Sequence, residues 1–243
     1  MTTSIQPESA AARAMCLSCE VNSLCFGHGA GIRALEQLDQ AVERRVHLAA
    51  GQYLYRIGDP FKSLYAIRSG CLKNSLRDDR GREHVMGFHM AGDVVGVGGI
   101  GRQAYIFDVR ALQSSEVCEV PFEKLQDLAE EVPALGRNIL KIFGRYRNRD
   151  AGSHSLRRSE SIEARLAGFL LDFSQRLQVH GFDPARFSLP MSREDIANHL
   201  GLTKGELDKG FARLEENNVA KVLRKSIEVS SIDALRSIAA SRG

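Results

Sequence analysis

Residues 192–206 read SREDIANHLGLTKGE and contain two predicted helix starts in quick succession. One begins at Ser192 and the other at Thr203, and each has the spacing of a capping box, in which side chains satisfy the free backbone amides of a first helical turn. Gly201 lies between them and is expected to end the first helix. Two helices joined by so short a turn form a helix-turn-helix, whose second helix enters the DNA major groove. This stretch therefore predicts a DNA-binding domain.

A β-hairpin is expected directly after the second helix. Residues 219–223 and 227–229 would form its strands, with a basic turn between them, and such a wing can place cations beside phosphates. A plain helical hairpin stays open as the alternative, because residues 204–225 carry six Lys or Arg against four acids. The candidate DNA-binding residues are Ser192, Arg193, Thr203, Lys204, Glu206, Lys209, Arg213, Arg224 and Lys225.

Residues 47–122 alternate between short apolar runs and turn signals. Glycines at positions 51, 58, 70, 81 and 92 recur at intervals of 7 to 12 residues. This spacing favours an antiparallel barrel or jelly roll over a parallel α/β sheet. Four further glycines between positions 96 and 101 lack the lysine of a phosphate-binding loop, so they predict a plain loop.

Helical periodicity flanks this region on both sides. Residues 32–46 predict an amphipathic helix ahead of it. Behind it, the pattern predicts a short helix from Phe122, a long one from 133 to about 156 and a third from 162 to 177. The apolar stripe of the long helix fades beyond Tyr146, so its second half is the weaker part of that prediction.

Three cysteines lie within residues 16–25, which read CLSCEVNSLC. Thiolates at this spacing can converge on one centre, and both a [4Fe–4S] cluster and a structural zinc ion usually take four. The fourth ligand would have to be Cys71 or Cys118, the two remaining cysteines. Spacing alone leaves cluster and zinc open, and unpaired or oxidised thiols on a flexible tail are the third possibility.

Composition sets the general class. The 243 residues are 43% hydrophobic and 26% charged, which is typical of a soluble globular protein. The first residues lack the pattern of a secretory signal, and no apolar run is long enough to span a membrane, so we expect a cytoplasmic protein. The net charge of +3 is too small to argue for nucleic acid by itself.

Four stretches together resemble a known family: residues 58–70, 87–96, 117–122 and 195–203. They are similar to the cAMP receptor protein superfamily and, within it, to the oxygen-sensing fumarate and nitrate reduction (FNR) regulators. The resemblance implies an α+β protein with an antiparallel β jelly-roll like that of cyclic-nucleotide-binding domains. The implied parts are a cysteine-bearing segment (1–30), the β-roll sensor (31–132), a dimerisation helix (133–158) and a winged helix-turn-helix (159–243).

The same resemblance implies the ligands and the mechanism. Cys16, Cys19, Cys25 and Cys118 would hold a [4Fe–4S] cluster, and Cys71 would pack as a small apolar residue. A homodimer with the cluster intact would bind promoter DNA and RNA polymerase, and oxygen would release it. The implied dimer residues are Leu135, Ile139, Ile142, Tyr146 and Arg149. Neither an enzymatic activity nor a cyclic nucleotide is expected.

This chain differs from the FNR pattern in its recognition helix. Gly205, Asp208 and Lys209 occupy the positions where the family has Glu, Ser and Arg, which implies a different operator sequence or weaker binding. Arg149 also places a charge in the apolar seam, which implies a dimer close in free energy to the monomer. The alternatives are a zinc-stabilised or nitric-oxide-responsive regulator of the same fold, with altered or lost operator specificity.

Overall fold

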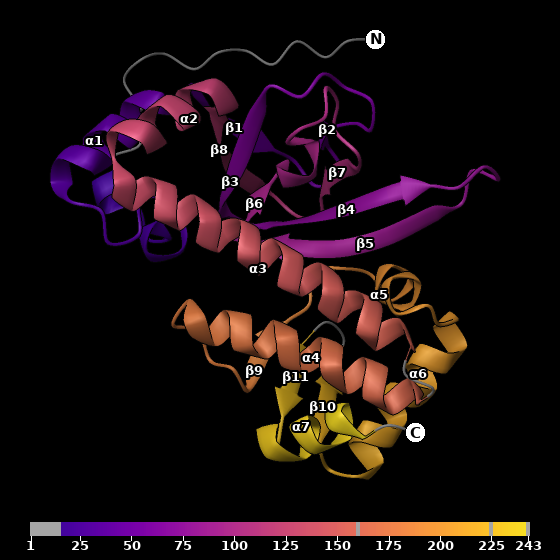
Figure 1. The fold of residues 1–243 in the computed structure, drawn as a ribbon. Coiled ribbons are helices and arrows are strands. Elements are labelled where there is room, and N and C mark those ends of the chain that lie inside the picture. The colour runs from indigo at the N-terminus through magenta and orange to yellow at the C-terminus, as the bar shows by residue number, and fades with distance from the viewer. Residues whose placement is uncertain (1–15, 159–160, 224–225, 242–243) are drawn as a thin grey trace.

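The computed structural model describes residues 16–158, 161–223 and 226–241 and has two parts joined by a long helix (Figure 1). The first part is a roll of two four-stranded antiparallel sheets, in the strand orders β1-β8-β3-β6 and β2-β7-β4-β5. Its strands are β1 (Arg44–Leu48), β2 (Tyr53–Tyr55), β3 (Ser63–Ser69), β4 (Cys71–Arg77), β5 (Glu83–Met90), β6 (Val94–Val95), β7 (Asp108–Ala111) and β8 (Ser115–Pro121). The predicted antiparallel roll is therefore confirmed.

The glycines that divide this region act as turn residues. All five predicted turn glycines have positive φ angles, which L side chains rarely adopt. At Gly70 a β-carbon would also lie 2.1 Å from Oγ of Ser115, so the space admits no larger residue. The expected plain loop after β6 begins with a short 3₁₀ helix, η3 (Val97–Gly99).

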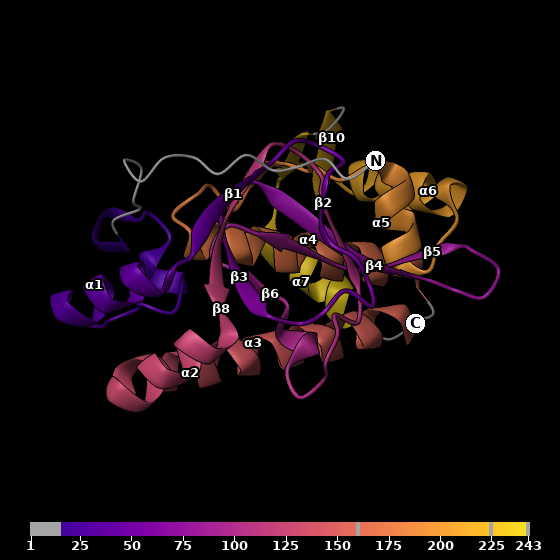
Figure 2. The same ribbon diagram turned by 90° about the horizontal axis from the view of Figure 1, so that it is seen from above.

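Helices close one end of the roll, where α1 (Ile32–Ala41) and α2 (Phe122–Glu131) lie near each other (Figure 2). The helix predicted over residues 32–46 ends at Ala41, and that prediction was wrong beyond this point. Residues 44–48 instead form β1, because they pair with β8, and Arg44 Nε donates to Glu119 Oε2 at 2.6 Å. Pairing with a strand so distant in sequence cannot be seen in local periodicity.

Helix α3 (Pro133–Arg158) runs without a break from the roll to the second part (Figure 1). It is therefore helical through the half where the apolar stripe fades. Its first half packs on the roll, where Leu135 and Ile142 are buried in one core cluster with Leu64 and Val120.

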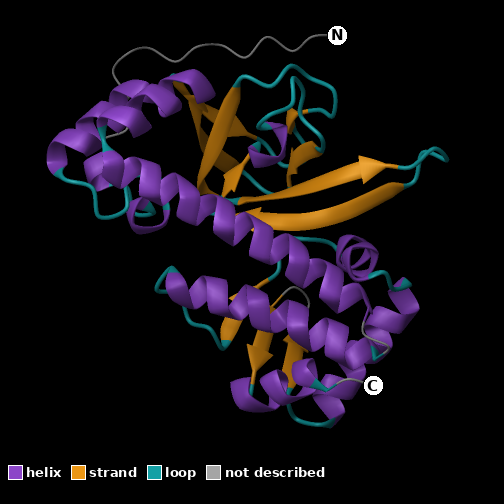
Figure 3. Cartoon of the chain, viewed as in Figure 1, coloured by secondary structure: helices purple, strands orange, loops and turns teal. Residues whose placement is uncertain are grey.

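The second part is a winged helix-turn-helix domain (Figure 3). Ser192 Oγ accepts from the Asp195 amide, and Thr203 and Glu206 form a complete capping box, so both predicted helix starts are confirmed. A third strand, β9, and the helix α7 were not predicted. The elements are α4 (Ile162–Val179), β9 (Arg186–Ser188), α5 (Arg193–Leu200), α6 (Lys204–Glu216), β10 (Ala220–Leu223), β11 (Ser226–Val229) and α7 (Ile232–Ala240), with the sheet order β10-β11-β9.

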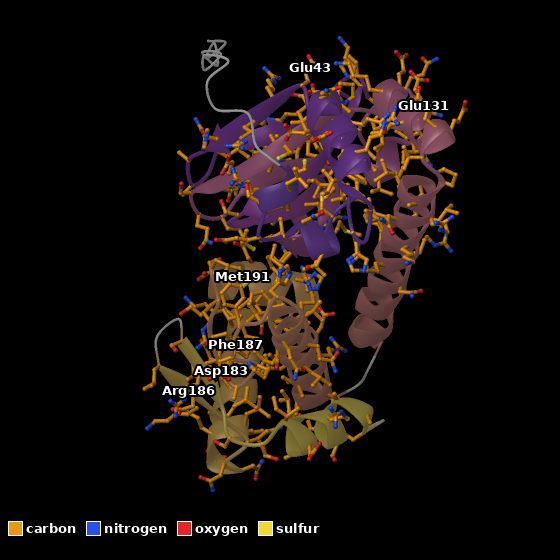
Figure 4. All side chains as sticks on the ribbon, turned by 90° about the vertical axis from the view of Figure 1, so that its left-hand side faces the viewer. Glu43, Glu131, Asp183, Arg186, Phe187 and Met191 are labelled. Atoms are coloured by element: carbon orange, nitrogen blue, oxygen red, sulfur yellow. The ribbon has the colours of Figure 1, made fainter. Side chains whose placement is uncertain are left out.

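The two parts share one hydrophobic core. The ring of Phe88 on β5 lies 5.9 Å from that of Phe169 on α4 and 5.2 Å from that of His199 on α5. Met191 belongs to the same cluster, and Figure 4 places it at the junction of the two parts. We refer to β1–β8 with α1 and α2 as the roll domain, and to α4–α7 with β9–β11 as the helix-turn-helix domain.

A buried lysine strengthens this junction. Lys73 on β4 is 1% exposed, and its Nζ lies 2.5 Å from Asp195 Oδ1 on α5 and 3.0 Å from Glu83 Oε2 on β5. Asn198 of α5 adds two bonds to the backbone of β5: its Oδ1 accepts from the Val85 amide and its Nδ2 donates to the Glu83 carbonyl, both at 2.7 Å. The β4–β5 pair therefore holds the first helix of the helix-turn-helix, as Figure 2 also shows.

Candidate metal centre and nucleic-acid interface

Four of the five cysteines line one recess in the roll domain. Cys16, Cys19, Cys25 and Cys118 all face it, and its empty volume is about 500 Å³ with the open solvent at its mouth included. Cys71 lies elsewhere, buried on β4 in the core that the two domains share. Of the two candidates for a fourth ligand, only Cys118 therefore joins the amino-terminal three.

The fold explains how a distant cysteine reaches the amino-terminal three. Two 3₁₀ turns, η1 (Cys16–Ser18) and η2 (Asn22–Leu24), wrap residues 16–25 into a compact loop, and the Cys25 amide donates to the Val21 carbonyl at 3.1 Å. Cys118 lies on β8, between Arg45 of β1 and Ala66 of β3. The loop covers this part of the sheet and brings both cysteine sources to one place.

The recess is apolar except for Asn22 and Arg68. Burial raises the pKa of the Cys25 thiol to about 12 and that of Cys118 to about 11. The guanidinium groups of Arg45 and Arg68 act in the opposite direction on Cys118. The thiols of Cys25 and Cys118 are therefore protonated at neutral pH until a metal replaces the protons, which is the usual competition at thiolate sites.

The donor set fits a metal group that takes four thiolates. Four cysteine sulfurs in one largely apolar recess match the ligand type and number of a [4Fe–4S] cluster and equally of a structural zinc ion. Among the residues that the structure describes, no three or more Cys, His, Asp or Glu side chains stand at metal-ligand spacing. To bind a single zinc ion, the four side chains would therefore have to draw closer together.

Helix α3 packs on the roll through side chains that the sequence analysis assigned to the dimer interface. Leu135 and Ile142 are buried against the roll, and Ile139 is partly buried beside them. Tyr146 lines a pocket inside the roll. Four of the five predicted dimer residues thus face the roll, and the side chain of Arg149 is not among those that the structure describes.

The outward face of α3 carries a leucine that the sequence pattern did not single out. Leu140 is 69% exposed, and Gly144 and Arg147, which follow it at intervals of four and three, are exposed on the same face. Because residues three and four apart share a helix face, these positions form a continuous outward surface. Helical periodicity in the sequence does not show which apolar residues the roll covers. The exposed leucine on this surface could therefore be recognised only from the structure.

Helix α6 also has two faces. Leu207, Phe211 and Leu214 pack into the domain core, whereas Asp208 and Lys209 are exposed. Gly210 lies on the buried side, where a β-carbon would be 3.0 Å from Ile162 and 3.2 Å from Leu166 of α4. This close approach accounts for a glycine inside the helix. No atom lies near a β-carbon built on Gly205.

Several predicted DNA-binding residues already have partners within the chain. Lys204 pairs with Glu194 at 2.8 Å, and Arg213 pairs with Glu163. The Arg193 guanidinium lies 3.7 Å from the centre of the Phe211 ring, so it packs on α6.

The capping residues also have local partners. Ser192 caps α5, and the side chains of Thr203 and Glu206 bond to each other. Lys209 on α6 is exposed, and Arg224 and Lys225 lie outside the described residues. The capping bonds follow the spacing that the sequence showed, whereas the pair of Arg213 with Glu163 joins residues 50 positions apart and could not be read from it.

These features define a class of protein: a DNA-binding regulator with a cyclic-nucleotide-binding-like roll. Residues 45–132 match the family model of the cyclic nucleotide-binding domain, and residues 164–238 match that of the Crp-like helix-turn-helix domain. The solved structure of FixK2 from Bradyrhizobium japonicum has the same fold, with a TM-score of 0.74 and 20% sequence identity, and it covers 82% of this chain and 98% of that one.

Two curated relatives narrow the class. The Fumarate and nitrate reduction regulatory protein of Salmonella typhimurium is 37% identical over 92% of this chain and 90% of its own length. The Transcriptional activator protein anr of Pseudomonas aeruginosa is 34% identical over 89% of each. This chain belongs to the fumarate and nitrate reduction (FNR) regulators of the cAMP receptor protein superfamily. It is a DNA-binding transcription regulator and not an enzyme, and none of its described helices could cross a membrane.

Proposed function

We propose that this protein is an oxygen-responsive regulator that holds a [4Fe–4S] cluster at Cys16, Cys19, Cys25 and Cys118 and controls promoter binding between aerobic and anaerobic growth. The observation that carries the proposal is the shared recess: Cys118 faces the amino-terminal three cysteines from a strand 93 residues further along the chain, and Cys71 does not. The FNR identity of the relatives supports the same cofactor.

The chain contributes a binding site and a link to α3. A bound [4Fe–4S] cluster would supply the chemistry that reacts with oxygen. The four thiolates would hold it, and Arg45 and Arg68 would balance part of their negative charge. Asn138 on α3 donates to the carbonyls of Phe26 at 2.9 Å and His28 at 2.6 Å, so the segment that follows Cys25 is tied directly to the long helix.

The output of the proposed switch is a homodimer on DNA. We propose that two copies meet along the outward face of α3, centred on Leu140, with Arg149 further along the same helix. Each protomer would then place α6 in one half-site of an inverted repeat, about 34 Å from the other. Such a dimer would act on promoters in the cytoplasm together with RNA polymerase.

A cyclic nucleotide is not part of this proposal. The pocket inside the roll, which Asn74, His89 and Tyr146 help to line, contains no lysine or arginine among its lining residues. A cyclic phosphate keeps a negative charge, and burying it without a cationic partner is costly. Nitric oxide stays open as a second signal at the same cysteines.

The decisive experiment compares two alanine variants of the anaerobically purified protein. Cys118→Ala should lose the brown colour, the iron and the acid-labile sulfide. Cys71→Ala should retain all three, because Cys71 lies outside the recess. Zinc without sulfide in the wild type would replace this proposal with that of a zinc-stabilised regulator, and full iron and sulfide in Cys118→Ala would remove Cys118 from the ligand set.

A further inference from the structure

The cysteine loop and the helix-turn-helix domain approach the same glycine of the roll from two sides. Gly92 lies in the turn between β5 and β6, with a φ of +81°. A β-carbon built there would lie 2.9 Å from both Cβ and Cδ1 of Leu24 and 2.8 Å from Cε1 of His180. Leu24 directly precedes Cys25, and His180 caps the end of α4. A bare backbone thus separates a residue of the cysteine loop from a residue of the DNA-binding domain.

Leu24 is held in this position from two sides. Its amide donates to the Val21 carbonyl at 3.0 Å, within the same 3₁₀ turn that positions Cys25. Its carbonyl accepts from Arg145 Nη2 of α3 at 2.8 Å. A rearrangement around Cys25 therefore cannot leave Leu24 unaffected.

The residue after Gly92 fixes the same end of α4. Asp93 Oδ2 lies 2.5 Å from Arg176 Nη2, and both side chains are largely buried. Arg176 also donates to the Phe88 carbonyl at 3.2 Å. Because Arg176 lies one turn before His180, the Gly92–Asp93 turn holds the last turn of α4 by an ion pair and by close packing.

Helix α4 in turn supports the recognition helix. Gly210 of α6 packs closely on Ile162 and Leu166, and Arg213 of α6 pairs with Glu163 at the start of α4. Rigid, closely packed helices move as units, so a shift at one end of α4 reaches α6.

We infer that Leu24, Gly92 and His180 form a relay within one protomer, which conveys the arrangement of the cysteine loop to the recognition helix independently of dimerisation. The relay rests on the proposed function in one respect: the cysteines must hold a group whose loss rearranges the loop. Its steric link, by contrast, exists whatever the cysteines bind. Cutting either side chain back to alanine removes Cδ1 of Leu24 or the imidazole ring of His180 from beside Gly92, and so uncouples the loop from α4.

The steric link is tested by amide hydrogen exchange on the full-length protein. Leu24→Ala should raise exchange in residues 176–182 by about threefold or more, because the end of α4 loses its support. Leu17→Ala is the matched control, since this exposed leucine also adjoins a ligand cysteine but does not contact Gly92, and it should leave that exchange unchanged. Equal exchange in wild type and Leu24→Ala would overturn the relay, even in protein that carries the full cluster.

The functional consequence is tested by the ratio of DNA dissociation constants before and after exposure to air. His180→Ala and Leu24→Ala should each reduce this ratio by about fivefold. The double variant should reduce it by no more than either single variant, since both substitutions remove the same coupling.

Sedimentation should show unchanged dimerisation in His180→Ala. An unchanged ratio in His180→Ala, or an effect that follows dimerisation alone, overturns the relay. If the wild type contains no iron and sulfide, and Leu24→Ala still raises amide exchange at the end of α4, the proposed function is rejected and the steric link is retained.

Discussion

The roll domain holds the helix-turn-helix domain at two ion pairs that differ in their surroundings. At the first, Lys73 is buried and paired with both Asp195 and Glu83. At the second, Arg176 pairs with Asp93 beside the loop that carries the cysteines. The first fixes α5 and is reinforced by Asn198, whereas the second fixes the end of α4 next to Leu24.

The difference suggests which contact is fixed and which one adjusts. Breaking the Lys73 network would leave buried charges without partners, which costs several kcal/mol, so a signal of ordinary size does not open it. Allosteric couplings are typically 1–3 kcal/mol, and packing of a leucine against a glycine and a histidine lies in that range. We therefore expect the helix-turn-helix domain to pivot about the Lys73 contact when the cysteine loop changes.

The largest expected effect comes from removing the lysine. Lys73→Met keeps the length of the side chain but leaves Asp195 and Glu83 close together, with only Arg110, 4.0 Å from Glu83, as a remaining cation. We expect the free energy of unfolding to fall by about 3 kcal/mol, measured by urea denaturation. Adding Asp195→Asn to Lys73→Met should restore part of this loss, because only one charge then lacks its partner. A loss below about 1 kcal/mol in Lys73→Met would mean that this contact is not the fixed one.

A smaller effect is expected at the amide that reinforces the same contact. Asn198→Ala removes the acceptor for the Val85 amide and the donor to the Glu83 carbonyl, and we expect a loss of about 1–2 kcal/mol in the free energy of unfolding. Asn148→Ala on the exposed surface of α3 is the control and should change stability little. If both variants behave alike, the bonds from Asn198 to β5 contribute nothing net.

Local signals made the helix-turn-helix predictable, and distant pairing limited the rest. Ser192 and Thr203 cap helices with residues three positions away, so their role is visible in sequence. Residues 44–46 continue a helical pattern, yet they form a strand because β8 offers a partner about 75 residues away. Lys73 looks like an ordinary polar residue within a strand, and only the structure shows two carboxylates from different elements around it.

The candidate sites show the same limit. The cysteine spacing indicated a metal, but the choice between Cys71 and Cys118 required the register of β8 or the resemblance to FNR regulators. Periodicity found an apolar stripe on α3 without showing that the roll already covers Leu135 and Ile142. The approach of Leu24 and His180 to Gly92 brings together residues from three separate parts of the chain, and no local pattern in the sequence predicts it.

The smallest expected effect is a pH dependence that separates the two contacts. Burial alone would raise the pKa of Glu83, but hydrogen bonds from Lys73 and Ser75 outweigh it and hold the pKa below its usual value of 4.5. A carboxyl whose pKa is lowered by folding stabilises the protein above its unfolded pKa, and this contribution is lost as the pH falls through the folded value. In Lys73→Met the lysine's part of this lowering is gone while that of Ser75 remains, so protonation costs the variant less than the wild type. The stability difference between wild type and Lys73→Met should therefore be constant from pH 7 to about pH 5 and shrink below about pH 4.5.

Urea denaturation of both proteins at intervals between pH 7 and 3.5 measures this difference. Because Glu83 is partly exposed, solvent screening keeps the change small. A difference that stays constant down to pH 3.5 would show that Lys73 does not stabilise the charged form of Glu83.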